Sequence, residues 1–339
     1  MSTYRRFNSL MRTTFLGTSD SAGRALDAVP GELIRPEGVR RYLIAIPDDA
    51  PPEGRPLVIV LHGGGASAAQ VMGRAFPPSP LSLLLEVAAR EPFVVVAPDA
   101  GEGGWADGCA RSARAAGRDD VAFVDAIIAR AIVEHGVDPA RVHVVGVSRG
   151  GWMAYRIASA IPHRLAAFAA ILAPMPESGP GSAPEVALPA LIAGGTADPL
   201  LPYRGGKYRY AFNFMGRLRS IDDSVAVWRC LGGLDDAPAT STIVPGSGQC
   251  GTSVTRTVWG ADPAGMQVEL YRIDGGGHAE PSRLKRYPSF INWLTGRQNG
   301  DVEIAEAAWT FFREKKRPHE RGRLRITARR LSAPVSGRP

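Results

Sequence analysis

Short runs of apolar, β-branched residues recur along the chain between turn-forming residues, and they predict β-strands. Several runs are apolar at every position, as expected for strands buried between two layers of helices. The predicted strands cover residues 41–46, 57–61, 93–97, 142–147, 167–172, 190–193 and 268–273.

Between these runs, hydrophobic residues return every three or four positions, which predicts helices. The predicted helices are Asp120–His135, 150–161, Ile221–Leu231 and an amphipathic closing helix at 301–315. The first should begin behind Asp119, a good N-cap, and end before Gly136, while the second should stop at Pro162. The loop-rich segment 202–266 around the third helix predicts an excursion over the sheet rather than a separate domain.

Strands that alternate with helices and short loops indicate an α/β fold, with a mostly parallel central sheet and helices on both faces. We expect a single domain over residues 31–312, preceded by an N-terminal extension (1–30) and followed by a basic tail (313–339). In such sheets, ligands bind at the carboxyl ends of the strands. The loops that follow the strands are therefore where chemistry is expected.

The net charge of +7 suggests a polyanion partner, but its distribution restricts that interpretation. Residues 313–339 hold ten Lys or Arg residues and two Glu residues, a net charge of +8, whereas the other 312 residues hold 30 basic and 31 acidic residues. A basic tail with few apolar residues cannot bury enough surface to order itself. The charge favours a solvated tail over a nucleic-acid or membrane-surface partner.

Composition argues against a disulfide-rich protein, a metal-binding protein and a membrane-spanning protein. With 45% hydrophobic and 22% charged residues, the chain is typical of globular proteins. Three cysteines are too few for a disulfide framework, although Cys230 and Cys250 could pair, and no spacing indicates a metal site. No apolar run of about 18 residues predicts a transmembrane helix. Because Arg12 interrupts the apolar stretch near the N-terminus, we expect a cytoplasmic protein, secreted only if the true N-terminus differs.

The strongest chemical signal is the GxSxG motif Gly146-Val147-Ser148-Arg149-Gly150. It follows a predicted strand and opens a predicted helix, which is the context of a nucleophilic serine. The turn is so tight that the residues two positions either side of the serine must lack a Cβ, and it pushes the serine hydroxyl above the sheet. Ser148 is therefore the candidate nucleophile.

A run of three glycines after His62 directly follows the strand at 57–61. Glycines there let backbone N–H groups turn toward a developing oxyanion without obstruction by side chains. We expect one donor from Gly64 or Gly65 and another from the N–H of Arg149, the residue after the nucleophile.

A serine hydroxyl needs a base, and one of the six histidines has the right place in the chain. His278 ends a glycine run after the last predicted strand, where the base of such a site arrives. The others lie in the glycine loop, in a strand, at helix ends or in the tail: His62, His143, His135, His163 and His319.

A carboxylate that orients the histidine is the third catalytic group, and it should lie between the serine and the histidine in the chain. Asp198 follows the strand at 190–193 by a short loop and is the expected carboxylate. Its rivals are Asp222, Asp223, Asp235, Asp236, Asp262 and Asp274.

Asp119 and Asp120 are expected to cap a helix. Trp105 and, more weakly, Tyr203 are candidates to line a substrate pocket, although Trp105 could instead cover its own core.

A family resemblance is carried by four motifs, in chain order: LHGGGAS (61–67), DPARVHVVGVSRGGWMAYRIA (138–158), GGTADPLLPY (194–203) and GGGH (275–278). Together they resemble the polyhydroxybutyrate depolymerase and feruloyl esterase family of α/β-hydrolase serine esterases. The resemblance implies the α/β-hydrolase fold, catalytic Ser148, Asp198 and His278, and oxyanion donors at Gly64 and Arg149. It also implies a short hydroxyalkanoate oligomer or an acylated sugar as the ester. Acyl transfer by a serine, a histidine and an aspartate needs no cofactor or metal.

Other functions remain open. The same residues could transfer an acyl group to a nucleophile other than water if the segment 202–266 closed over the site. A non-catalytic protein of this fold whose tail binds a polyanion is a second alternative. Peptidase activity is a third, although amides are harder substrates and no propeller-sized domain restricts access.

Overall fold

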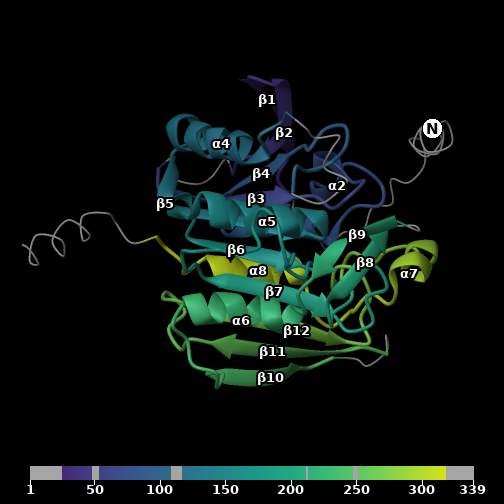
Figure 1. The fold of residues 1–339 in the computed structure, drawn as a ribbon. Coiled ribbons are helices and arrows are strands. Elements are labelled where there is room, and N and C mark those ends of the chain that lie inside the picture. The colour runs from purple at the N-terminus through teal and green to yellow at the C-terminus, as the bar shows by residue number, and fades with distance from the viewer. Residues whose placement is uncertain (1–24, 48–52, 108–116, 211–212, 247–250, 318–339) are drawn as a thin grey trace, which may run out of the picture.

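The computed structural model describes residues 25–47, 53–107, 117–210, 213–246 and 251–317 (Figure 1). Within them, a ten-stranded sheet has the order β1-β2-β4-β3-β5-β6-β7-β12-β11-β10. Its strands are β1 (Ala28–Arg35), β2 (Gly38–Ala45), β3 (Arg55–Leu61), β4 (Val94–Pro98), β5 (Val137–Val147), β6 (Ala167–Ile171), β7 (Ala190–Gly195), β10 (Thr240–Val244), β11 (Ser253–Trp259) and β12 (Val268–Asp274). The strands from β4 to β12 in this order run parallel, and antiparallel pairs close both edges.

Helices cover both faces of the sheet (Figure 1). They are α2 (Ala68–Val71), α3 (Leu84–Arg90), α4 (Asp120–His135), α5 (Arg149–Ala160), α6 (Ile221–Leu231), α7 (Ser289–Thr295) and α8 (Ile304–Phe312), with 3₁₀ turns η1 (Pro80–Leu83) and η3 (Pro162–Arg164). Strand residues alternate between two cores. In β3, Ile59 and Leu61 pack with α4, α5 and α6, whereas Val58 and Val60 pack with α2, α3 and α8. The predicted single-domain α/β fold is confirmed.

The seven predicted strands are all present. Four of them, β3, β4, β6 and β7, are buried on both faces, which requires the continuous apolar runs that stand out in the sequence. The bounds predicted for α4 and α6 are also confirmed. Asp119 caps α4 by accepting a hydrogen bond from the Ala122 N–H, and Gly136 ends the helix in the left-handed conformation, with φ of 63°. The closing helix α8 is shorter than predicted.

Asp120 is not a cap, contrary to the sequence-based expectation. Its carboxylate is buried, 2.6 Å from the Arg40 guanidinium and 2.6 Å from the backbone N–H of Ala106. These bonds tie the start of α4 to β2 and to the loop after β4, and they compensate the burial of the charge.

The prediction that 202–266 is a loop-rich excursion is wrong in part. The segment holds the predicted helix α6, but also the separate ribbon β8 (Gly206–Tyr210) and β9 (Asn213–Leu218), and it adds β10 and β11 to the sheet. Most of β10 is exposed, so its residues carry no apolar run to reveal it. An edge strand has one neighbour and needs little hydrophobic sequence. The strand β1, at the other edge of the sheet, was not predicted for the same reason.

Both ends of the described fold reach beyond the domain limits of 31–312 that were expected from the sequence. At the N-terminal end, β1 begins at Ala28. At the C-terminal end, the buried Lys315 ammonium donates hydrogen bonds to the Pro263 carbonyl and, at 2.8 Å, to the Gln267 side chain. Residues 1–24 and 318–339 lie outside the described residues, as do Cys109 and Cys250, while Cys230 is exposed. In the part of the chain that is described, every helix is too short or too polar to cross a membrane.

Candidate active site

Ser148 occupies a strained turn between β5 and α5. Its backbone has φ of 56° and ψ of −121°, a conformation that residues with a Cβ rarely adopt. A Cβ on Gly146 would lie 2.1 Å from the Gly150 carbonyl oxygen, and one on Gly150 would lie 2.2 Å from the Leu61 carbonyl oxygen. The steric requirement for glycine on both sides of the serine is thus confirmed.

Backbone hydrogen bonds hold this turn in place. The Ser148 N–H donates to the Ile171 carbonyl at 2.9 Å, which fixes the turn to the end of β6. The Ser148 carbonyl accepts from Gly151 and Trp152 in the first turn of α5. The hydroxyl therefore stands at the N-terminal end of a helix, where the backbone dipoles favour negative charge.

The loop after β12 brings His278 to Ser148. The imidazole Nε2 lies 2.8 Å from the Ser148 hydroxyl oxygen, and the side chain is 10% exposed. The loop packs closely on the end of β7, since a Cβ on Gly195 would lie 2.4 Å from the Gly276 carbonyl oxygen. The Gly277 N–H also donates to the Arg297 carbonyl at 2.8 Å.

Asp198 completes a hydrogen-bonded line. Its Oδ2 lies 2.6 Å from His278 Nδ1, and its Oδ1 accepts from the backbone N–H groups of Leu200 and Leu201, each at 2.8 Å. The ionised carboxylate is an acceptor, so Nδ1 carries the imidazole hydrogen and Nε2 accepts from the Ser148 hydroxyl.

The electrostatic surroundings of His278 favour its protonated form. Burial disfavours the imidazolium, but the charge and hydrogen bond of Asp198 and the charge of Glu280 outweigh burial and raise the pKa of His278 above its usual value. An imidazole that gains a proton is therefore stabilised in this site.

The rival carboxylates have other partners. Asp222 accepts a hydrogen bond from the Tyr203 hydroxyl at 2.6 Å, Asp236 pairs with Arg229, and Asp274 accepts from Arg272. Among the described acidic residues, Asp198 is the one within hydrogen-bond distance of His278.

The glycine loop lies against the start of α5. A Cβ on Gly64 would lie 2.8 Å from Arg149 Cδ, and one on Gly63 would lie 3.5 Å from Ser148 Cβ. His62 holds the loop with both ring nitrogens, since Nδ1 bonds the Gly63 carbonyl and Nε2 accepts from the Ala100 N–H. Burial lowers the pKa of His62, so it stays a neutral structural residue.

Sequence reasoning missed Asp107 as a partner of Arg149. The buried Asp107 carboxylate lies 2.6 Å from Arg149 Nε, and the same guanidinium donates to the Trp105 carbonyl at 2.9 Å. The pair joins the loop after β4 to the residue that follows Ser148. In the sequence, the one indication of this ion pair is that the Gly103–Gly108 loop contains an acidic residue.

Neither expected pocket residue presents surface to a ligand. Trp105 is fully buried, and its indole N–H donates to the His62 carbonyl at 2.8 Å. Trp105 thus covers its own core, the other outcome that its sequence position allowed. Tyr203 is also buried, with its hydroxyl bonded to Asp222.

The helix α7 ends at Thr295 and lies beside the loop that carries His278, because the backbone N–H of His278 donates to the Thr295 carbonyl. None of its residues is buried, and Phe290, Trp293 and Leu294 are all exposed, with Trp293 at 83%. These exposed apolar side chains thus belong to a helix whose last residue, Thr295, bonds the backbone of His278.

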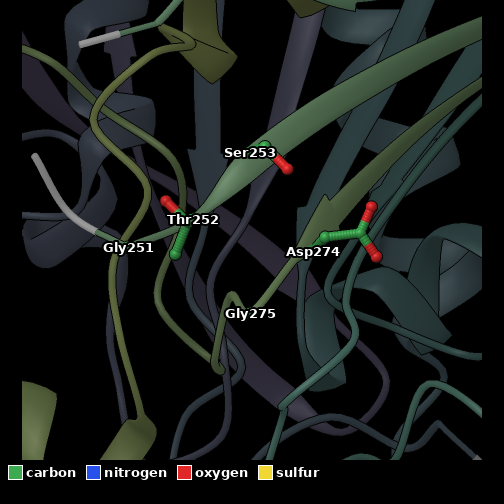
Figure 2. A pocket seen from close by; sticks show the side chains of 5 residues that line it. All are labelled: Gly251, Thr252, Ser253, Asp274 and Gly275. Carbon is green, nitrogen blue, oxygen red and sulfur yellow. The ribbon is translucent and has the colours of Figure 1, made fainter. Parts of the chain in front are cut away.

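A surface hollow opens at the ends of β11 and β12 and is lined by Gly251, Thr252, Ser253, Asp274 and Gly275 (Figure 2). It adjoins the glycine run before His278, and Gly275 N–H donates to the Thr196 hydroxyl at 2.9 Å. None of the expected site residues lines it. Across the described residues, no three His, Cys, Asp or Glu side chains gather as a metal site would require.

The alpha/beta hydrolase family model matches residues 58–310 of the chain. NocK of Nocardia uniformis subsp. tsuyamanensis, which is named as an esterase, is 30% identical over 279 residues, 78% of this chain and 78% of that protein. Feruloyl esterase C of Emericella nidulans is 30% identical over 169 residues, 49% of this chain and 58% of that protein.

Among solved structures, the acetyl xylan esterase from Aspergillus awamori has a TM-score of 0.51 and 14% identity, over 78% of this chain and 98% of that one. This likeness concerns the fold. The match to the family model and the extent of the similarity to NocK establish that the chain belongs to the alpha/beta hydrolase family.

Proposed function

We propose that this chain is a serine carboxylic ester hydrolase that works through an acyl-enzyme. The observation that supports this function most strongly is the continuous line from Ser148 Oγ through His278 to Asp198, with contacts of 2.8 Å and 2.6 Å. A hydroxyl, an imidazole and a carboxylate in this order form the machinery of nucleophilic acyl transfer. The esterase relatives agree with this chemistry.

In the first step, the Ser148 hydroxyl transfers its proton to His278 Nε2 as its oxygen attacks the ester carbonyl. Asp198 holds Nδ1–H and stabilises the imidazolium. The tetrahedral intermediate then collapses, the bond to the alcohol oxygen breaks, and His278 returns the proton to the departing alcohol. The acyl group remains on Ser148.

In the second step, water replaces the alcohol. His278 takes a proton from the water, the oxygen attacks the acyl carbonyl, and the intermediate releases the carboxylic acid as Ser148 regains its proton. The backbone N–H groups of Gly64 and Arg149 hold the oxyanion in both steps. One such donor is worth about 3–4 kcal/mol in the transition state of known hydrolases.

The ester is proposed to be a short hydroxyalkanoate oligomer or an acylated sugar. The resemblance to polyhydroxybutyrate depolymerases and feruloyl esterases supports both classes. We also propose that the exposed side chains of Phe290, Trp293 and Leu294 contact the hydrocarbon part of either ester, because their helix α7 ends at Thr295, whose carbonyl accepts from the His278 N–H.

A panel of p-nitrophenyl esters of increasing acyl length tests the activity, and mass spectrometry of the quenched reaction tests for an acyl group on Ser148. We expect turnover, an acylated active-site peptide, and loss of both in the Ser148→Ala variant. Added alcohols report whether water or another acceptor takes the acyl group.

Undiminished hydrolysis by Ser148→Ala would refute the mechanism. Absence of turnover with every ester, together with tail-dependent binding of a polyanion that weakens steeply with salt, would favour the non-catalytic alternative.

A further inference from the structure

Asp107 lies in the loop after β4, and its side chain is fully buried. Its Oδ2 accepts a hydrogen bond from Arg149 Nε at 2.6 Å, and Nη2 of the same guanidinium donates to the Trp105 carbonyl at 2.9 Å. A Cβ on Gly104 would lie 3.0 Å from Arg149 Nη1, so the backbone of this loop also lies close to the guanidinium. The loop therefore fixes the end of the Arg149 side chain.

The stem of the same side chain lies against the glycine loop that follows β3. A Cβ on Gly64 would lie 2.8 Å from Arg149 Cδ and 3.3 Å from its Cγ, so the arginine fills the space beside Gly64. Arg149 is also the first residue of α5, directly after Ser148. One side chain therefore joins the two positions whose backbone N–H groups are proposed to hold the oxyanion.

The loop after β4 is itself anchored next to Asp107. The Ala106 N–H donates to the buried Asp120 carboxylate at 2.6 Å, which ties the loop to the start of α4. The Trp105 indole N–H donates to the His62 carbonyl at 2.8 Å, which ties it to the start of the glycine run. Because Asp107 directly follows these two residues, its carboxylate has a fixed position.

The two proposed oxyanion donors belong to different segments, the loop after β3 and the start of α5. An N–H group stabilises the transition state only if it is aimed at the place that the negative oxygen takes there, because hydrogen bonds weaken steeply with distance and angle. Contacts between the two segments therefore decide how well the donors work together. A hydrogen bond between ionised groups is about twice as strong as a neutral one, which suits Asp107 and Arg149 to this task.

We propose that Asp107 is a positioning residue for the oxyanion site formed by the backbone N–H groups of Gly64 and Arg149. By holding the guanidinium, Asp107 keeps the arginine stem against Gly64 and fixes the separation of the two donors. This role rests on the proposed function. Asp107 acts through Arg149 and needs no contact with the substrate.

A pair of substrates tests the proposal on the full chain. Attack on p-nitrophenyl acetate places the negative charge on oxygen, whereas attack on O-p-nitrophenyl thionoacetate places it on sulfur, which accepts N–H hydrogen bonds weakly. The ratio of the two kcat/KM values therefore reports the oxyanion donors, and the amount of folded protein cancels from it.

In Asp107→Asn, we expect kcat/KM for p-nitrophenyl acetate to fall about tenfold to a hundredfold, less than the hundredfold to thousandfold that loss of a whole donor costs. The value for the thionoester should change by less than about threefold, so the ratio should fall. A merely structural Asp107 would lower both values equally and leave the ratio at its wild-type level.

A double-variant cycle shows whether Asp107 acts through the arginine. Arg149→Met removes the guanidinium, keeps an unbranched stem beside Gly64 and leaves the backbone N–H in place. It should lower the ratio as Asp107→Asn does. The double variant should lower it no further, because either change releases the same side chain.

Glu269→Gln is the matched control. It removes a buried carboxylate from Arg256, which Glu269 meets at 2.6 Å near the start of β12, at the opposite end of this strand from the His278 loop. We expect the ratio in Glu269→Gln to equal that of wild type.

An equal ratio in wild type and Asp107→Asn would overturn the proposal, and so would additive losses in the double variant. If Asp107→Asn fails to fold, the double variant still decides, because it removes both charges of the pair together, and a wild-type ratio there would overturn the proposal. Wild-type protein that turns over no ester would refute the proposed function and this role together. Wild-type turnover with an unchanged ratio in the variants would refute the role of Asp107 alone.

Discussion

Replacing Asp198 by asparagine should disable the site by reversing one hydrogen bond. Asp198 Oδ1 accepts from the backbone N–H groups of Leu200 and Leu201, each at 2.8 Å. An asparagine must place its carbonyl oxygen there, because its NH₂ group would face two other donors. The NH₂ group then points at His278 Nδ1.

A donor at that position forces His278 into the wrong tautomer. Nδ1 becomes the acceptor, the imidazole hydrogen moves to Nε2, and Nε2 can no longer accept the Ser148 proton across the 2.8 Å contact. In serine hydrolases this tautomer error costs about 10⁴-fold in rate, which corresponds to about 5.5 kcal/mol. We expect kcat/KM of Asp198→Asn to fall by about that factor.

The assay is p-nitrophenyl acetate hydrolysis at neutral pH, with thermal unfolding measured alongside. Since asparagine matches aspartate in size and keeps the bonds to Leu200 and Leu201, the melting temperature should change by no more than about 4 °C. Asp222→Asn is the matched control, because it removes the same charge from the Tyr203 contact and leaves His278 alone. A folded Asp198→Asn protein that keeps more than about a tenth of the wild-type kcat/KM would refute the tautomer reasoning.

Three further outcomes are expected. Gly150→Ala places a methyl group 2.2 Å from the Leu61 carbonyl oxygen and should lower the free energy of unfolding by about 3 kcal/mol or more in urea titrations. Gly63→Ala, with an ordinary contact of 3.5 Å, should cost far less, and equal costs would contradict the steric argument. Burial lowers the pKa of His143 from 6.5 to about 3, so the unfolded chain binds a proton that the folded one excludes. The His143 contribution to the free energy of unfolding is therefore full above pH 6.5 and falls as the pH drops toward 3, by at most about 1.4 kcal/mol per unit. His143→Leu should flatten that slope in denaturation curves across this pH range, and an unchanged slope would exclude His143 as its source. Trp293→Ala should raise KM about fivefold for long acyl esters, by loss of apolar contact, and leave p-nitrophenyl acetate unaffected. Equal effects on both esters would exclude a substrate contact at Trp293.

The parts of the fold that the sequence predicts are those where one local constraint decides the outcome. The strands buried on both faces, such as β3 and β4, are apolar along most of their length, and Asp119 and Gly136 mark where α4 begins and ends. The turn at Ser148 is equally local, because its glycines are required by contacts within the turn and with the adjacent end of β3.

Features that depend on partners far away in the chain cannot be predicted from the local sequence. Asp120 looks like a first-turn acid, and only the Arg40 side chain, 80 residues earlier, makes it a buried ion pair. Trp105 faces the core rather than a pocket because the His62 carbonyl accepts its N–H. Glu280 and Asp107 gain their partners from other segments, so no spacing along the chain reveals them.

Ser148 and His278, the two partners of the 2.8 Å contact, are held in place by different interactions. Ser148 lies in a strained turn that is packed so closely that backbone atoms fill the space beside Gly146 and Gly150. His278 belongs to a loop that is fixed by hydrogen bonds: the Gly277 N–H donates to the Arg297 carbonyl, and the Glu280 carboxylate accepts from the Ser79 and Tyr287 hydroxyls. Close backbone packing of this kind cannot be lost one contact at a time, whereas each hydrogen bond stabilises by about 1 kcal/mol and can be lost separately. The accuracy of the 2.8 Å contact between Ser148 and His278 is therefore set by the loop. This gives a physical reason for the loop to bury a carboxylate at Glu280, where an apolar residue would bind neither Ser79 nor Tyr287.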